Sequence, residues 1–493
     1  MLFNSYIFIF FFLPISVGVF LILAKAKLDQ WALTWAVLIS LIFYGWWEPY
    51  YVVLMLLSIL GNYSLGALIG KTERANFRLS LTITGVSLNL LLLGFFKYFN
   101  FSVENVNSLF GTNYHLEQII LPIAISFFTF EQIAYIVDRY RERTPSPRFL
   151  HYSFFVSFFP QLIAGPIAHH KEIIPQIKSR LIDRIDGTMI VIGISIFCVG
   201  LFKKVMIADK VAEYSTPIYT SVSNGETIGF WESWVAAFGY TFQIYFDFSA
   251  YSDMAIGIAC LFGVRLPQNF NSPYKATSII EFWRRWHMTL SRFLRDYLYF
   301  LLGGNRKGNY RRYTNLMITM LLGGLWHGAG WGFVLWGALH GIFLSINHIW
   351  RKLFGSKSEN LYSFIWATSS RFLTLICIVF TWVLFRTESV SLTLEVYGGM
   401  FGINGAGDFE NFTIPIFFII ILWIWVLVLP NSLELFGDYI RAKKDGIVYS
   451  TNKKSVVQLS WKPSKNWALL LASVTFISII NLAEISEFIY FQF

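Results

Sequence analysis

The sequence predicts an all-α, polytopic membrane protein with about eleven or twelve transmembrane helices. Of its 493 residues, 55% are hydrophobic and 19% are aromatic, whereas only 14% are charged. A soluble globular protein carries about 25% charged residues. One water-soluble core could not enclose 50 Phe, 25 Tyr and 18 Trp. The net charge of +10 is therefore attributed to loops that set membrane orientation, and no nucleic acid partner is expected.

Twelve apolar runs are long enough to cross the hydrocarbon core, which takes about 20 residues per helix. The first, 7–23, is followed rather than preceded by basic residues, so we expect a retained span and not a secretory signal. A further run, 152–168, contains two prolines and is expected to be re-entrant, because irregular backbone at membrane depth must be buried in protein. The predicted spans lie near 7–23, 31–47, 50–70, 79–98, 119–137, 189–208, 231–263, 314–333, 334–350, 361–385, 412–430 and 467–483.

Lysine and arginine are distributed unevenly among the predicted loops. With the N-terminus outside, 33 of the 39 basic residues lie in cytoplasmic segments, and the long outer loops 99–118 and 387–411 contain none. This asymmetry predicts that both termini are extracytoplasmic. Lys203, Lys204 and Lys210 do not fit the scheme. The predicted cytoplasmic segments are 24–30, 71–78, 138–151, 169–188, 264–313, 351–360 and 431–466.

The chain shows no internal repeat, low-complexity tract or separate soluble domain. We therefore expect a single transmembrane domain over 1–493. Its most informative part is 240–345. A C-terminal extension, 361–493, is expected to end in an external aromatic tail at 485–493.

Acidic and hydroxyl side chains occur within an apolar run that reads YFDFSAYSDMAIGIACLFG, and they include Asp247, Ser249 and Asp253. An ionised carboxylate at mid-membrane costs about 2.5–3.5 kcal/mol, so these residues should face the protein interior. Two interpretations remain open: a supporting polar network between helices, and a direct role in a site.

A helix is predicted to begin at Ser278, because Glu281 stands three residues later in a capping-box spacing. Apolar residues then recur every three or four positions, and arginines occupy another face. Such a helix is typical of a membrane interface. The apolar face contains Trp283, Trp286, Leu290, Phe293 and Tyr297, and the basic face contains Arg285, Arg292 and Arg295.

The basic face allows two interpretations. It is an anchor in the cytoplasmic leaflet, or it is in addition a rim that binds an anionic, phosphate-bearing acyl donor. His287 lies within this segment, where a lone histidine is more often structural. The predicted donor-binding residues are Trp283, Arg284, Arg285, Trp286 and Trp326.

His327 stands in the stretch GGLWHGAG, inside a long apolar segment. The glycines around it form small-xxx-small pairs that allow helices to approach closely. From the predicted start of the span, His327 lies about 20 Å into the membrane. A neutral imidazole at that depth can take the proton of an attacking hydroxyl during acyl transfer. Function is the default for an ionisable group inside a membrane.

His340 and His348 are interpreted as structural. His340 follows His327 by 13 residues, about 220° around an ideal helix, so local geometry does not bring the two rings together. The histidines and the three cysteines show no metal-ligand spacing, so we expect no metal.

At these residues the sequence resembles the membrane-bound O-acyltransferase (MBOAT) family. The similar stretches are YFDFSAYSDMAIGIACLFG, NFNSPYKATSIIEFWRRWHMTLSRFLRDYLY, LLGGNRKG and GGLWHGAGWGFVLWGALHG. The resemblance covers essentially the whole chain, and within the family it is to the bacterial branch that O-acetylates exported polysaccharides such as alginate and peptidoglycan.

The resemblance implies two functional histidines, His287 and His327, of which the second is the catalytic base and the first orients or polarises the donor. It also implies a central tunnel between a cytoplasmic donor and an outer acceptor in a bacterial inner membrane. The implied donor is acetyl-CoA, with no permanently bound cofactor. The implied partners are membrane lipid, an extracytoplasmic SGNH-type acetyltransferase and the exported polysaccharide.

The last six residues, FIYFQF, allow two interpretations of Tyr490. Aromatic side chains are favoured at membrane interfaces, so the tail can be an anchor. A phenol can also carry an acyl group as an ester once a base has taken its proton. In the teichoic acid branch of the family, a small partner protein ends in a similar motif.

The predicted function is therefore acetyl transfer across the membrane for O-acetylation of an exported cell-envelope polysaccharide. Three alternatives remain: a D-alanyl or other acyl transferase of the same family, a membrane transporter or polymer exporter, and a scaffold that has lost its own chemistry. A transporter often shows inverted repeats, which this chain lacks.

Overall fold

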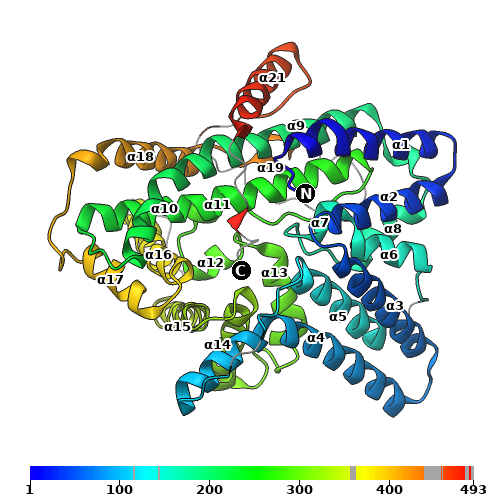
Figure 1. The fold of residues 1–493 in the computed structure, drawn as a ribbon, viewed down its shortest axis with the longest axis horizontal. Coiled ribbons are helices and arrows are strands. Elements are labelled where there is room, and N and C mark those ends of the chain that lie inside the picture. Colours follow the sequence, from blue (N-terminus) through cyan, green and yellow to red (C-terminus); the bar gives the residue numbers. More distant parts are fainter. Residues whose placement is uncertain are drawn as a thin grey trace.

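The computed structural model of the chain consists of helices joined by short connections (Figure 1). No strand occurs in the part of the chain that it describes, which agrees with the predicted all-α class. The described residues are 1–114, 117–142, 145–355, 362–437, 457, 459–483, 488 and 489.

Of the N-terminal helices, α1, α2, α3 and α5 lie on the right of Figure 1, and α4 lies along the bottom of the view. Helix α1 packs against α2, and α5 packs against both α3 and α4. The helices are rich in Leu, Ile and Phe because their outer surfaces face lipid rather than water. Their bounds are η1 Phe8–Phe12, α1 Leu13–Lys25, α2 Asp29–Tyr44, α3 Tyr50–Lys71, α4 Ala75–Phe110 and α5 Ile125–Arg141.

Helix α11 lies at the centre of the molecule and is buried along most of its length. Its most extensive partner is α9, and the two backbones approach closely where Gly257 meets Gly193. A Cβ added to Gly257 would lie 2.6 Å from the Gly193 carbonyl oxygen, so only glycine allows this approach. The helices of this region are α9 Gly187–Phe202, η3 Lys203–Ala208, α10 Asp209–Ser223 and α11 Phe230–Leu261.

The segment 152–168, predicted to be re-entrant, is buried throughout and is not one continuous helix. It contains two short helices that break at Phe158, before Pro160. The broken backbone is surrounded by protein, as irregular structure in a membrane protein must be. The short elements before α9 are α6 Phe149–Ser157, α7 Phe159–Leu162, α8 His170–Lys178 and η2 Ile182–Arg184.

The predicted helix that begins at Ser278 does begin there, and the Ser278 hydroxyl accepts a hydrogen bond from the Glu281 amide. It is not continuous, however, because the chain breaks at His287. The predicted apolar face is also buried in protein and not in lipid: Trp286 packs on Trp382, and Phe293 stacks on Phe130. The elements are η4 Pro273–Lys275, α12 Ile279–Trp283, α13 Met288–Phe293 and η5 Leu294–Tyr299.

Helices α14 and α15 pack closely against each other through glycines. Gly324 faces the Phe333 carbonyl, and Gly337 faces the Met320 carbonyl, so neither site has room for a Cβ. The predicted packing role of these glycines is confirmed. The remaining helices are α14 Gly308–His327, α15 Trp331–Phe354, α16 Tyr362–Arg386, α17 Val390–Met400, η6 Glu410–Phe412, α18 Thr413–Val428, α19 Ser432–Leu435, α21 Lys465–Ile480 and η7 Asn481–Ala483.

Seven helices in the described residues are long and apolar enough to cross a membrane. Two shorter apolar helices, α2 and α21, coincide with predicted spans. The protein is thus a multi-pass membrane protein, and the further spans that would make eleven or twelve remain a prediction. The seven are Phe8–Lys25, Tyr50–Lys71, Ala75–Phe110, Gly187–Ser223, Trp331–Phe354, Ile365–Arg386 and Glu410–Val428.

Candidate active site

Two buried histidines lie close together at breaks in the helices. His327 is the last residue of α14, and three residues of extended or bent chain separate it from α15. His287 adopts a left-handed backbone conformation (φ +41°) between α12 and α13. The ring centroids are 6.5 Å apart, and His327 is 6% and His287 0% exposed. A positive φ is strained for a non-glycine residue, and such strain concentrates at functional sites.

Asn269 fixes the orientation of the His287 ring. Its side-chain oxygen lies 3.0 Å from Nδ1 of His287 and also accepts a hydrogen bond from the Thr289 hydroxyl at 2.9 Å. Because that oxygen is an acceptor, Nδ1 carries the proton and Nε2 has the lone pair. Nε2 is buried and has no hydrogen-bond partner among the described residues. The neutral ring therefore presents a hydrogen-bond acceptor, and not a hydrogen-bond donor, to a group that approaches Nε2.

Aromatic rings enclose His327. The ring centroids of Trp326, Trp336 and Phe385 lie 5.0, 5.1 and 5.2 Å from its own. Such surroundings exclude water and favour the neutral imidazole. The ring of His340 also lies close to Trp336, with centroids 4.6 Å apart.

Lys97 of α4 holds the end of α14 in place. Its ammonium group donates to the carbonyls of Trp326 at 2.5 Å and His327 at 2.9 Å. These carbonyls belong to the last turn of the helix, where they lack an intrahelical partner and where the helix dipole favours a cation.

We expect Lys97→Met to lower the stability of the protein by roughly 1–3 kcal/mol, because two buried carbonyls lose their donor. The measurement is thermal unfolding in detergent, followed by tryptophan fluorescence. Lys71→Met, an exposed lysine at the end of α3, is the control and should unfold as the parent does. Equal unfolding temperatures for the two variants would show that the α14 terminus does not depend on Lys97.

A small cavity of about 20 Å³ adjoins His327. This volume holds about one water molecule. An acyl group therefore needs movement of the surrounding side chains before it can reach the imidazole, and the tunnel remains a prediction. The lining residues are Ile244, Asp247, Phe248, Trp286, His327, Trp382, Phe385 and Ile489.

The C-terminal tail reaches this cavity. Phe488 packs edge-on against Tyr251 at 4.8 Å, and the Ile489 amide donates to Oδ2 of Asp247 at 3.0 Å. Ile489 itself lines the cavity beside His327. Tyr490, the predicted acyl carrier, lies outside the described residues. The tail is therefore buried in the protein at Phe488 and Ile489, which the sequence did not predict, and its position on the outer side of the membrane remains a prediction.

Asp247 and Asp253 pair with lysines of η3. Lys204 lies 2.6 Å from Asp247 and 2.9 Å from Asp209, and Lys203 lies 2.8 Å from Asp253. Ser249 bonds only weakly, at 3.5 Å, to a carbonyl of its own helix. Lys203 and Lys204 did not fit the orientation scheme because they are not loop residues: their charges are neutralised within the protein.

Asp247→Asn is expected to release the tail, because both carboxylate oxygens of Asp247 are in use. Oδ1 accepts from Lys204 and Oδ2 from Ile489, whereas asparagine has one acceptor oxygen. Removal of one partner from a buried ion pair is strongly destabilising, so C-terminal residues should become accessible to carboxypeptidase roughly tenfold faster or more. Mass spectrometry of the intact protein measures this release.

The matched control is Asp253→Asn on the same helix. Asp253 contacts Lys203 through Oδ2 alone, so asparagine can keep that hydrogen bond. If both variants release the tail at the same rate, Asp247 does not hold it.

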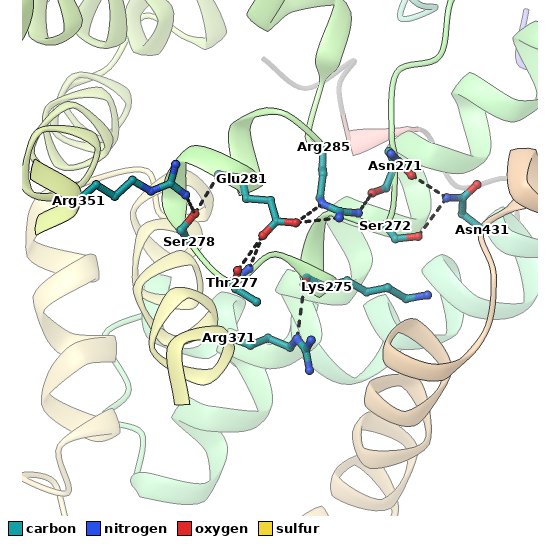
Figure 2. Close-up of polar contacts among 10 residues, drawn as sticks. All are labelled: Asn271, Ser272, Lys275, Thr277, Ser278, Glu281, Arg285, Arg351, Arg371 and Asn431. Carbon is teal, nitrogen blue, oxygen red and sulfur yellow. Dashed lines mark hydrogen bonds and ion pairs between the residues drawn. The ribbon is translucent and has the colours of Figure 1, made fainter. Parts of the chain in front are cut away.

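The predicted donor-binding rim divides into an outer and an inner part. At the outer part, Arg284 is exposed, whereas Arg285 lies between Glu281 and the Asn271 carbonyl (Figure 2). Burial alone would raise the pKa of the Glu281 carboxyl, but hydrogen bonds from Thr277 and Arg285 lower it below its ordinary value. The polar network drawn in Figure 2 comprises Asn271, Ser272, Lys275, Thr277, Ser278, Glu281, Arg285, Arg351, Arg371 and Asn431.

The predicted tryptophans belong to the inner part of the site. Trp283 donates to Nδ1 of His340 at 3.2 Å, and Trp286 lines the cavity beside His327. Trp326 stacks on Phe130 at 5.2 Å and lies against His327. The structure thus brings the tryptophans near the histidines, whereas Arg284 stays exposed and Arg285 is bound to Glu281.

Sequence reasoning missed several residues of this site. Asn269 and Lys97 act through partners distant in the sequence, and only the buried charge of Lys97 in an apolar run was a signal. The argument against His340 assumed one continuous helix and is wrong on that point, because the chain breaks at 328–330. His327 and His340 therefore contact the same tryptophan from two different helices.

Comparison with known proteins relates this architecture to acyltransferases. A model of the membrane-bound O-acyltransferase family matches residues 30–386, which include both histidines. A peptidoglycan O-acetyltransferase of Helicobacter pylori is 38% identical over 100% of this chain and 98% of that protein. A probable alginate O-acetylase, AlgI of Pseudomonas putida, is 38% identical over the full length of both proteins.

A more distant relative covers less of the chain. A teichoic acid D-alanyltransferase of Bacillus subtilis is 26% identical over 52% of this chain and 65% of that protein. The full-length relatives are thus acetyl transferases by name, whereas the match to the D-alanyl branch is partial.

Proposed function

The chain belongs to the membrane-bound O-acyltransferase family and is an O-acyltransferase, and from this premise we propose that it moves an acetyl group from a cytoplasmic donor across the bacterial inner membrane for O-acetylation of an exported cell-envelope polysaccharide. Acetyl transfer is favoured over D-alanyl transfer because the relatives that match over the whole length are named for acetylation. The transporter alternative is disfavoured because the chain shows no inverted repeat and its full-length relatives are named as acetyl-transferring enzymes.

The observation that carries the proposal is the position of His327, buried at a helix break, 6.5 Å from His287 and open to a cavity. In the proposed step, the oxygen of a hydroxyl attacks the thioester carbonyl of the donor as His327 takes its proton. The carbon–sulfur bond then breaks, and the proton passes to the departing thiolate. His287, fixed by Asn269, orients the donor through its Nε2 atom.

The proposed donor is acetyl-CoA, docked at the basic rim. Exposed Arg284 supplies a guanidinium group suited to phosphate, whereas the guanidinium group of Arg285 is held by Glu281 and the Asn271 carbonyl. Trp286 lines the cavity beside His327, Trp326 lies against His327, and Trp283 contacts His340, which supports a role for these tryptophans in donor binding. The proposed step uses only side chains of the protein and the acyl donor, without a metal.

Tyr490 is the proposed carrier on the outer side. Its neighbour Ile489 lines the cavity beside His327, which supports transfer of the acetyl group to the Tyr490 phenol as an ester. An extracytoplasmic acetyltransferase of SGNH type would then move the group to the polymer. Because Asp247 anchors the tail beside the cavity, Tyr490 can take the acetyl group there, and the polysaccharide hydroxyl need not enter the cavity.

Two measurements test this function. Purified protein incubated with labelled acetyl-CoA should release free CoA, whereas a transporter or a scaffold would not. Acetyl analysis of the exported glycans of the host, with and without this protein, should show loss of O-acetyl groups when the protein is absent. Loss of D-alanyl esters with unchanged acetyl content would overturn the proposal in favour of the other branch.

A further inference from the structure

A second, larger cavity lies away from the histidines, where three separate segments meet. Its walls are the turn between α1 and α2, the chain before and at the start of α6, and the end of α8. Its volume is about 740 Å³, within the range of about 300–1,000 Å³ that is usual for small-molecule sites. We call it the basic cleft, and its charged and titratable lining residues are Lys27, Asp29, Arg148, His151, Lys178 and Arg180.

Positive charge dominates the basic cleft. Its four lysine and arginine side chains are exposed, and none forms a hydrogen bond or ion pair with another described residue. The one carboxylate, Asp29, is directed to the backbone, where it accepts from the Leu181 amide at 3.3 Å. Arg292, by contrast, is paired with Glu172 at 2.6 Å. With four cationic side chains against one carboxylate, the cleft has a net positive charge suited to an anion.

His151 adds a hydrogen-bonding group to the wall of the cleft. Its Nδ1 is buried and has no hydrogen-bond partner among the described residues. Burial, and then the charges of Arg148 and Lys178, lower the pKa of its imidazole. A neutral histidine with an unused nitrogen is a hydrogen-bonding group for a ligand that also carries negative charge.

The cleft opens beside lipid-facing helix surface. Trp31, at the start of α2, lines it and is 65% exposed, as expected of an aromatic residue at a membrane interface. Farther along α2, Leu38 and Ile42 are exposed as well. A headgroup in the cleft would therefore leave its acyl chains along α2. All three wall segments fall within predicted cytoplasmic segments, where anionic lipids are concentrated.

We propose that the basic cleft binds the glycerophosphate headgroup of an anionic phospholipid, with phosphatidylglycerol as the probe of that class. The phosphate lies among Arg148, Lys178 and Arg180, and the glycerol hydroxyls reach His151. This site is independent of acyl transfer, and it gives the N-terminal half of the enzyme a bound lipid of its own.

Native mass spectrometry of the purified full-length protein tests the proposal. The protein is offered equal amounts of phosphatidylglycerol and phosphatidylcholine, and we expect retention of the first to exceed that of the second about tenfold. In Arg148→Gln/Lys178→Gln/Arg180→Gln, this preference should disappear. The control, Arg306→Gln/Lys307→Gln/Arg311→Gln, removes the same charge from exposed positions before and in α14 and should keep it.

Three results would overturn the proposal. Equal retention of both lipids by the parent protein excludes a headgroup site, and an unchanged preference in the first triple variant places the lipid elsewhere. Displacement of the lipid by inorganic phosphate at equal concentration would make this a site for soluble phosphate. Because the readout is lipid binding, failure of the acetyl-transfer proposal would leave each of these outcomes unchanged.

Discussion

His327→Gln is expected to abolish acetylation of the exported polymer while the protein still inserts and folds. Glutamine is close to histidine in size but has no titratable nitrogen, so the proposed base is lost and the shape of the site is kept. General-base catalysis contributes about 10²–10⁴-fold to the reaction rate. The rate of CoA release should therefore fall by at least about 10²-fold. Membrane extraction and size-exclusion chromatography measure folding in parallel.

His348→Gln is the matched control for this experiment. His348 lies toward the far end of α15, where its ring contacts Arg312 at 2.6 Å and no part of the cavity. We expect its activity to stay within about twofold of the parent. Normal acetylation by His327→Gln would exclude His327 as the base, and the scaffold interpretation would then account better for the chain.

Tyr490→Phe is expected to stop transfer of the acetyl group to the polymer, because phenylalanine keeps the aromatic ring and removes the hydroxyl that would carry the ester. In the parent protein, mass spectrometry of the C-terminal peptide after turnover should find a peptide heavier by one acetyl group. The same peptide from Tyr490→Phe should stay unmodified. The His327→Gln variant should also lack the modification, since the phenol would have no base.

The two interpretations of the tail give opposite results for this variant. If Tyr490→Phe transfers acetyl groups at the parent rate, the carrier role fails and the tail is an anchor alone. Tyr6→Phe is a suitable control, because its hydroxyl bonds to the Ile479 carbonyl near the same end of the chain, away from the cavity. That variant should lose one exposed hydrogen bond and no activity.

Composition and local pattern were sufficient for the class of this protein and for part of its site. The scarcity of charge, the long apolar runs and the isolated polar residues within them predicted helices in a membrane with functional groups at depth. His327 and Asp247 were singled out this way, since a titratable group in an apolar run costs free energy and is retained for a reason. The role of His287 was implied only by the family resemblance. The helix start at Ser278 was predicted from the capping-box spacing between Ser278 and Glu281.

Contacts between distant segments were beyond such reasoning. Asn269 orients His287, and Lys97 caps the helix that ends at His327 across more than two hundred positions. Neither pairing leaves a periodic trace. The same holds for Lys204: as a loop charge it contradicted the predicted orientation, and as the partner of Asp247 it holds the tail.

What the sequence by itself determined is whether each segment lies in lipid or in water. The free energy of transferring a segment between the two depends on its residue types and its length alone. What only the tertiary structure decided is which polar groups meet inside the protein. It placed the C-terminal tail beside His327 and broke two predicted helices to bring the histidines together. Those choices depend on hydrogen bonds and packing between segments, and each buried polar group is stable only where a partner from elsewhere in the chain satisfies it.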